Sequence, residues 1–160
     1  MARIFNFAAG PSTLPVETLQ EAAAKMVDFE NTGMSLIEMS HRGKVYEGVH
    51  NETIALIREI LQVPENYHIL FLQGGATLQF GMIPMAFLQQ GMTADYILTG
   101  SWAKKAYDEA KMYGQANIIA SSEDKVFSYI PDLTNLKITP EADYVYMCEN
   151  NTIFGTKYKT

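Results

Sequence analysis

The spacing of apolar residues changes from a helical to a strand-like period along the chain. Two helical patterns come first, at about residues 15–33 and 46–61. Short, nearly continuous apolar runs then alternate with two further helical patterns, at about 77–88 and 101–113. The apolar runs lie at residues 67–72, 94–98, 117–120 and 143–148. Such runs are typical of strands buried on both faces, so the alternation predicts an α/β domain with a mostly parallel sheet.

Helix-breaking residues set the expected ends of these elements. Residues 1–14 contain several of them and predict an extended N-terminal arm. Pro15 suits the first turn of a helix, and Gly33 can take the left-handed conformation that ends one. The segment 123–140 predicts mostly loop with one short helix. Beyond the last strand the chain passes into a loop that covers nothing, so we expect residues 15–160 to form an incomplete domain with open sheet edges.

Composition and charge narrow the class of protein. The 160 residues are 48% hydrophobic and 19% charged, as in a folded domain, and the formal net charge is −6. An acidic chain without a basic run is a poor match for nucleic acid or an anionic membrane. No apolar stretch reaches the roughly 20 residues of a membrane helix, and the N-terminus lacks a signal-peptide core. The single cysteine excludes an intrachain disulfide, so we expect a cytoplasmic protein.

The first candidate site follows the apolar run at 67–72. The sequence Gln73-Gly74-Gly75-Ala76-Thr77 passes from that run into a helix. Glycines allow close backbone approach, and the free N–H groups of a helix start suit a phosphate. This pattern predicts an anion site as readily as it predicts a tight turn without a ligand.

Two further candidates end other predicted strands. Trp102, the only tryptophan, follows the run at 94–98 and could stack on a flat ring. Thr152 follows the run at 143–148 and could bind a ligand oxygen. Taken alone, core packing explains Trp102 better, and an ordinary polar loop explains Thr152 better. Ligands of open α/β sheets nevertheless lie beyond the carboxyl ends of the strands, where both residues are expected.

The remaining candidate binding residues are a histidine and an arginine. His41 and Arg42 lie between the first two helical patterns, and an arginine fork beside a histidine can grip phosphate or carboxylate. Taken alone, they are better explained as a solvated surface pair. We expect His50 and His68 to be structural and Cys148 to be a buried small hydrophobe rather than a nucleophile. No Cys/His spacing indicates a metal site.

As an ordered set, these motifs resemble the phosphoserine aminotransferase family over the whole chain. The segment 6–15 (NFAAGPSTLP) is similar to the family's N-terminal signature. The segment 39–42 (MSHR) resembles the motif that reaches the substrate's acidic groups, partly across a dimer interface. The segment 74–77 (GGAT) resembles the loop that holds the cofactor phosphate. The segments 100–102 (GSW) and 150–155 (NNTIFG) resemble those carrying the ring-stacking tryptophan and the threonine at the phenolic oxygen.

The resemblance implies the large domain of a fold-type-I, class-V aminotransferase, a three-layer α/β unit that binds pyridoxal 5′-phosphate (PLP). It assigns cofactor binding to Ala76, Thr77, Trp102 and Thr152, and substrate binding to His41 and Arg42. Members are homodimers that convert 3-phosphohydroxypyruvate and glutamate to phosphoserine and 2-oxoglutarate in serine biosynthesis. Some members also act on a related substrate in vitamin B6 (pyridoxine) biosynthesis.

The family's Schiff-base lysine, its pyridinium-pairing acid and its C-terminal small domain have no counterpart in these 160 residues. We therefore expect a chain that ends before the lysine, contains no catalytic residue of its own and is inactive alone. The alternative is a non-catalytic α/β module that binds a phosphorylated ligand. A downstream Asp and Lys would indicate the enzyme, whereas cooperative unfolding of a monodisperse 160-residue protein would indicate the module.

Overall fold

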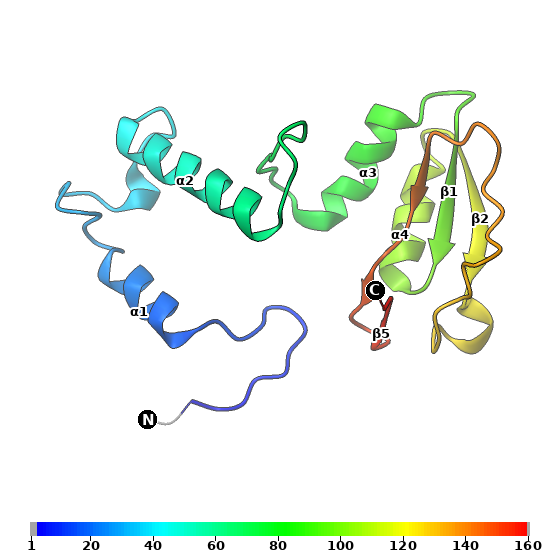
Figure 1. The fold of residues 1–160 in the computed structure, drawn as a ribbon, viewed down its shortest axis with the longest axis horizontal. Helices are drawn as coiled ribbons and strands as arrows, with labels where there is room; N and C mark the ends of the chain where they lie inside the picture. Colours follow the sequence, from blue (N-terminus) through cyan, green and yellow to red (C-terminus); the bar gives the residue numbers. More distant parts are fainter. Residues whose placement is uncertain (1–2, 160) are drawn as a thin grey trace. The chain divides into compact units, whose positions relative to one another are not determined.

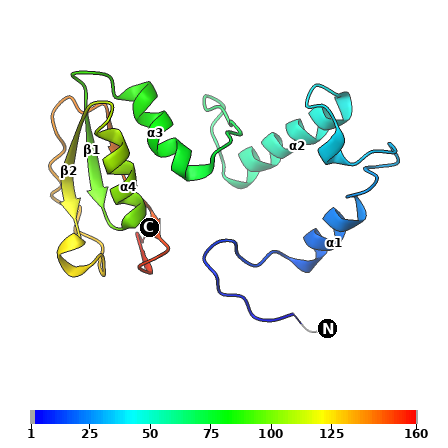
Figure 2. The same cartoon turned by 180° about the vertical axis from the view of Figure 1, so that it is seen from behind.

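The computed structural model describes residues 3–159, and the chain forms two compact units, Met1–Phe71 and Leu72–Thr160 (Figures 1 and 2). The first unit contains the helices α1 (Val16–Ala24) and α2 (Lys44–Ile60) with the short 3-10 helix η1 (Leu36–Glu38) between them. Among the described residues, the second unit contains two α-helices, one short 3-10 helix and all the strands. Within residues 3–159 no helix has the length and apolar character needed to cross a bilayer.

The first helix is shorter than the sequence pattern predicts. α1 begins after Pro15 as expected, but it ends at Ala24 rather than near residues 31–33. In the following turn, side chains form hydrogen bonds with backbone N–H and carbonyl groups. The Asp28 carboxylate accepts from the Gly33 N–H at 2.9 Å, and the Thr32 hydroxyl donates to the Phe29 carbonyl at 2.7 Å. Such local bonds compete with the helix, so Gly33, although left-handed at φ +74°, does not cap α1.

The apolar stripes of the first unit are largely exposed. Neither α1 nor α2 contains a buried residue. Leu19 on α1 and Leu56 and Ile60 on α2 are 43%, 49% and 73% exposed. The predicted helical periodicity is thus present, but within this unit it does not build a closed core.

The strand predicted at residues 67–72 is wrong. This segment is extended but pairs with no strand among the described residues, and Leu70 is 72% exposed. Its start is held by α2 instead, because the Arg58 guanidinium donates to the carbonyl oxygens of Pro64 at 2.7 Å and Tyr67 at 3.0 Å. An apolar run shows where a strand could form but supplies no neighbour for it to pair with.

The second unit has the predicted α/β class with a mostly parallel sheet. Its three-stranded sheet has the order β2-β1-β3, and both pairings are parallel. The strands are β1 (Thr93–Leu98), β2 (Gln115–Ser121) and β3 (Tyr144–Tyr146). A short antiparallel hairpin of β4 (Asn150–Asn151) and β5 (Thr156–Lys157) follows. The segment 123–140 is mostly loop with one short 3-10 helix, η2 (Glu123–Lys125), as expected.

Small residues allow a helix to lie close to the central strand. The helices of this unit are α3 (Gly75–Phe87) and α4 (Ser101–Ala110), and α4 packs against both β1 and α3 (Figure 1). Ala103, Ala106 and Ala110 on α4 are fully buried and share a core with Tyr96 and Leu98 of β1. Side chains alternate across a strand, so Asp95 lies on the opposite face of β1.

That opposite face is closed by a buried carboxylate. Asp95 is fully buried, and its two oxygens accept from the Thr139 backbone N–H at 2.6 Å and from the Thr139 hydroxyl at 2.7 Å. The same hydroxyl accepts from the Asn117 side-chain amide at 3.2 Å. Because a buried carboxyl group is costly unless it is hydrogen-bonded, Thr139 fastens the irregular segment before β3 onto the sheet.

We predict that Thr139→Val lowers the free energy of unfolding by about 1–3 kcal/mol, because one Asp95 oxygen loses its donor in a buried site. Chemical denaturation of the chain measures this change. Thr134→Val is the matched control, since the Thr134 hydroxyl donates to the exposed Asp132 at 2.6 Å. The control should change stability by less than about 0.5 kcal/mol. Equal effects of the two substitutions would contradict the buried-carboxylate account.

Candidate functional site

The carboxyl end of β1 lies against the start of the hairpin. The Thr99 hydroxyl donates to the Asn151 side-chain oxygen at 3.0 Å, and both residues are buried. A Cβ placed on Gly100 would lie 2.9 Å from the same Asn151 oxygen, so a larger residue would force that side chain to move. The approach brings the next residues on each side together, Trp102 in the first turn of α4 and Thr152 after β4.

The start of α3 offers uncapped backbone N–H groups. Gly74 and Gly75 have φ values of +93° and +60°, in the left-handed region that favours glycine. At Gly74 a Cβ would also lie 2.4 Å from the Leu78 side chain, so no other residue fits there. The helix start has no side-chain cap within residues 3–159. Its first N–H groups and the positive end of the helix dipole are therefore available to an anion.

These features surround one cavity of about 300 Å³ in the second unit. It is lined by Ala76, Thr77, Phe80, Trp102, Tyr146, Cys148, Asn150 and Thr152. Each of the four residues expected to bind a cofactor lies on this wall. Together they offer N–H donors for an anion, a flat aromatic surface and a hydroxyl, which suits a phosphorylated planar ligand.

Aromatic packing builds the wall that the sequence analysis missed. Tyr146 stacks on Tyr96 with ring centroids 5.1 Å apart, and Phe80 meets the Tyr146 ring edge-on at 6.3 Å. Burial raises the pKa of Tyr146 to about 12 and also raises the pKa of the Cys148 thiol. Both groups are uncharged at neutral pH, so they add no charge to the cavity that would oppose an anion at α3.

The missed residues carried a readable signal. Tyr144, Tyr146 and Cys148 alternate along the predicted strand 143–148, which places them on one face. Cys148, expected to be a buried hydrophobe, is only partly buried and reaches the cavity.

Trp102 and Thr152 are joined directly. The Trp102 indole Nε1–H donates to the Thr152 hydroxyl oxygen at 3.2 Å. The Lys105 ammonium, one turn further along α4, lies 4.8 Å from the centroid of the Trp102 ring. Lys105 itself is not among the residues that line the cavity.

The expected substrate-binding residues line a separate cavity within the first unit. His41 and Arg42 share it with Tyr46, Glu47, His50, Asn51 and Phe71. His50, expected to be structural, is part of an aromatic contact there, because its ring meets Phe71 edge-on at 5.3 Å. The Arg42 guanidinium can pair with an acidic group here, and the Glu47 carboxylate lines the same cavity.

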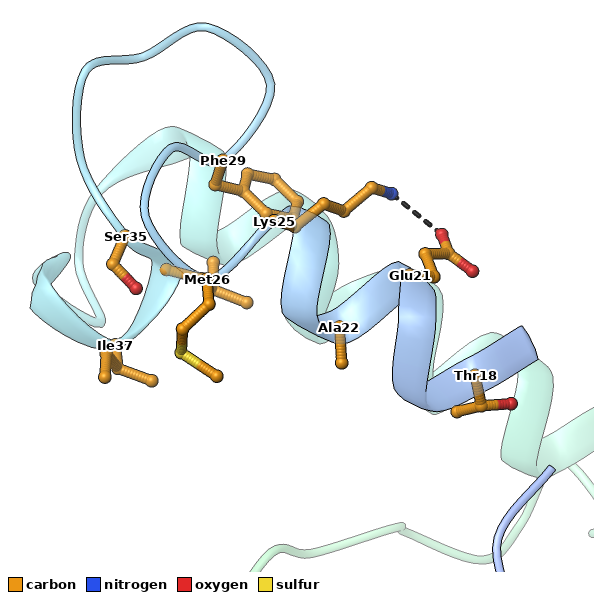
Figure 3. A pocket seen from close by; sticks show the side chains of 9 residues that line it. Thr18, Glu21, Ala22, Lys25, Met26, Phe29, Ser35 and Ile37 are labelled. Atoms are coloured by element: carbon orange, nitrogen blue, oxygen red, sulfur yellow. Dashed lines mark hydrogen bonds and ion pairs between the residues drawn. The ribbon is translucent and has the colours of Figure 1, made fainter. Parts of the chain in front are cut away.

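A further groove in the first unit lies between α1 and η1 (Figure 3). Its walls are mainly apolar, with Ala22, Met26 and Phe29 from the α1 side and Ile37 from η1. Its polar contact is an exposed ion pair between Lys25 and Glu21 at 2.9 Å. Exposed pairs of this kind contribute little stability and leave no group poised for chemistry, so we regard the groove as surface rather than as a site.

Comparison with known proteins places these features in a family. The family model described as aminotransferase class-V matches residues 4–160. The phosphoserine aminotransferase of Halalkalibacterium halodurans is 51% identical over 160 residues, which are 100% of this chain and 44% of that protein. The enzyme of Bacillus subtilis is 48% identical over 99% of this chain and 44% of its own length. The chain thus spans less than half the length of these relatives.

Solved structures agree with the sequence matches. The phosphoserine aminotransferase of Bacillus circulans subsp. alkalophilus superposes with a TM-score of 0.93 at 49% identity, covering 99% of this chain and 44% of that one. The PLP-bound phosphoserine aminotransferase of Trichomonas vaginalis superposes with a TM-score of 0.88 at 41% identity, covering 98% and 44%. With the family model matched over nearly all its residues, the chain belongs to the class-V aminotransferase family.

Proposed function

We propose that this chain supplies the cofactor-binding part of a PLP-dependent phosphoserine aminotransferase. The reaction transfers the amino group of glutamate to 3-phosphohydroxypyruvate and yields phosphoserine and 2-oxoglutarate. One observation carries the proposal: the start of α3, Trp102 and Thr152 converge on a single cavity. The relatives named phosphoserine aminotransferase, at 51% and 48% identity, support it.

The cavity has the chemistry that PLP requires. A phosphate suits the uncapped start of α3, where Ala76 and Thr77 lie. A planar pyridine ring suits the indole of Trp102, and the ring's phenolic oxygen suits the Thr152 hydroxyl. When bound, PLP withdraws electrons from the substrate carbon that loses its proton. The residues of this chain bind and orient it, and the neutral Tyr146 and Cys148 help to exclude water.

We further propose that His41 and Arg42 bind the substrate's acidic groups. The Arg42 fork beside His41 suits the phosphate or carboxylate of phosphoserine, glutamate and the two oxo acids. The exposed apolar side chains of α1 and α2 support a homodimer, because a second copy could cover them. We also propose that the enzyme is cytoplasmic and acts in serine biosynthesis, with a further role in the related pyridoxine pathway. In this proposal residues 1–14 form an arm, and one cofactor domain begins at residue 15.

The non-catalytic phosphate-binding module is the second candidate. The phosphate site alone would fit it, but the family match and the aromatic and hydroxyl walls favour the aminotransferase. One feature still separates this chain from a working enzyme. Among the described residues no lysine lines the cavity, so PLP lacks a partner for the covalent link that transamination uses.

We predict that Thr77→Asp weakens binding of PLP at least about tenfold, because a carboxylate at the start of α3 repels the phosphate. Aspartate in a first helical turn favours the helix, so the loss would not reflect unfolding. Quenching of Trp102, the only tryptophan, measures binding, and protection of Cys148, the only thiol, from alkylation at alkaline pH confirms it. Thr134→Asp adds the same charge in an exposed loop and should leave the affinity unchanged. Equal weakening by the two variants would contradict a phosphate site at α3.

A second prediction concerns the chain's own reactivity. We expect the wild-type chain with PLP to form no phosphoserine from glutamate and 3-phosphohydroxypyruvate. Borohydride reduction followed by peptide mass mapping should then show no single lysine modified in stoichiometric yield. Stoichiometric labelling of one lysine, or measurable phosphoserine, would show that this chain has a covalent anchor and would contradict the prediction.

A further inference from the structure

The bond between Trp102 and Thr152 can run in only one direction. An indole Nε1–H is a donor without acceptor capacity, whereas a threonine hydroxyl has one proton to donate and two lone pairs. The 3.2 Å contact therefore uses a lone pair of the Thr152 hydroxyl and leaves its proton free. Because Trp102 donates to it, the Thr152 hydroxyl can act as a hydrogen-bond donor to another group in the cavity.

That free proton has no protein acceptor in the described part of the chain. Within residues 3–159 the Thr152 hydroxyl donates to no carbonyl, carboxylate or side-chain oxygen, although the residue lines the cavity. An ordinary structural hydroxyl returns its proton to a nearby carbonyl, as Thr53 does to the Val49 carbonyl at 2.7 Å. The Thr152 hydroxyl is instead held as a donor at the cavity wall.

Neighbouring residues hold both partners of the Trp102–Thr152 bond in place. Thr152 directly follows Asn151, which is buried and bound to Thr99. Trp102 follows Gly100, whose backbone lies against the same Asn151 side chain. The Lys105 ammonium lies 4.8 Å from the centroid of the indole ring and adds a cation–π contact. The relative placement of N–H and hydroxyl is thus built into the fold rather than left to a ligand.

We propose that Trp102 is a positioning residue for the cofactor's phenolic oxygen and acts through Thr152, in addition to any stacking on the ring. This proposal rests on the proposed function, because the acceptor is the ring oxygen of a pyridoxal-type ligand. A hydroxyl that accepts from an N–H is polarised into a better donor. A donor aimed at the phenolic oxygen stabilises its ionised form, so the Trp102 N–H lowers the pKa of the bound phenol.

The test uses the 160-residue chain and two non-covalent ligands. Pyridoxine 5′-phosphate carries the ring hydroxyl and an alcohol in place of the aldehyde, and its 3-deoxy analogue lacks only the ring hydroxyl. The affinity ratio of the two, measured by calorimetry, isolates the contact at the phenolic oxygen from stacking and phosphate binding. The variants are Trp102→Phe, Thr152→Val, their double mutant and Thr152→Ser, which keeps the hydroxyl.

We expect the wild type and Thr152→Ser to prefer the hydroxyl-bearing ligand by about 3- to 10-fold, the range of one hydrogen bond. Trp102→Phe keeps an aromatic ring but removes the N–H, and it should lose most of this preference. On the Thr152→Val background the same change should remove nothing further, since interacting residues are non-additive. The bound ligand's absorption should also show a higher phenol pKa in Trp102→Phe than in the wild type.

A ligand-free measurement keeps the inference separable from the proposed function. The single tryptophan gives one indole N–H resonance in a nitrogen–proton correlation spectrum. Thr152→Val should move it, and Thr152→Ser should not. An unmoved resonance, or an affinity ratio that Trp102→Phe leaves intact, would contradict the positioning role of Trp102 without contradicting the cofactor site. Failure of the wild type to bind either ligand would contradict both the proposed cofactor site and the positioning role of Trp102 in it.

Discussion

The approach of the β1–α4 turn to the hairpin is the constraint on which the candidate site depends. Thr99 binds Asn151 in a buried position, and Gly100 leaves no side chain between the two backbones. Without that approach the indole of Trp102 and the hydroxyl of Thr152, fifty positions apart in the chain, would not meet. The buried Thr99–Asn151 pair thus fixes the site, as the Asp95–Thr139 hydrogen bonds fix the segment on the other face of the sheet.

The electrostatics of the cavity follow from neutral walls and one polarised end. Tyr146 and Cys148 stay protonated because burial disfavours their charged forms. The start of α3 then provides the cavity's anion-attracting end, through backbone N–H groups that need no charged side chain. Specificity for a phosphorylated ring can arise from this arrangement without a lysine or arginine in the wall.

The sequence predicted the second unit better than the first. The runs at 94–98 and 117–120 are strands because each finds a parallel neighbour, and the residues after the predicted strands at 94–98 and 143–148 meet as expected for an α/β edge. The run at 67–72 has similar apolar character but pairs with no described strand. The pattern within a segment does not show whether a partner strand is present. The length of α1 was also missed, because side chains of Asp28 and Thr32 decided it by competing for backbone groups. The bond from Trp102 to Thr152 depends on tertiary approach and had no sequence signal at all.

The most direct test of the account is a map of backbone and indole resonance shifts when pyridoxine 5′-phosphate is added to the isotope-labelled chain. We predict saturable shifts centred on Ala76, Thr77, the Trp102 indole and Thr152, the residues that one cavity brings together. Shifts centred on the α1–η1 groove, or scattered over the surface without saturation, would contradict the assignment of this cavity as the cofactor site.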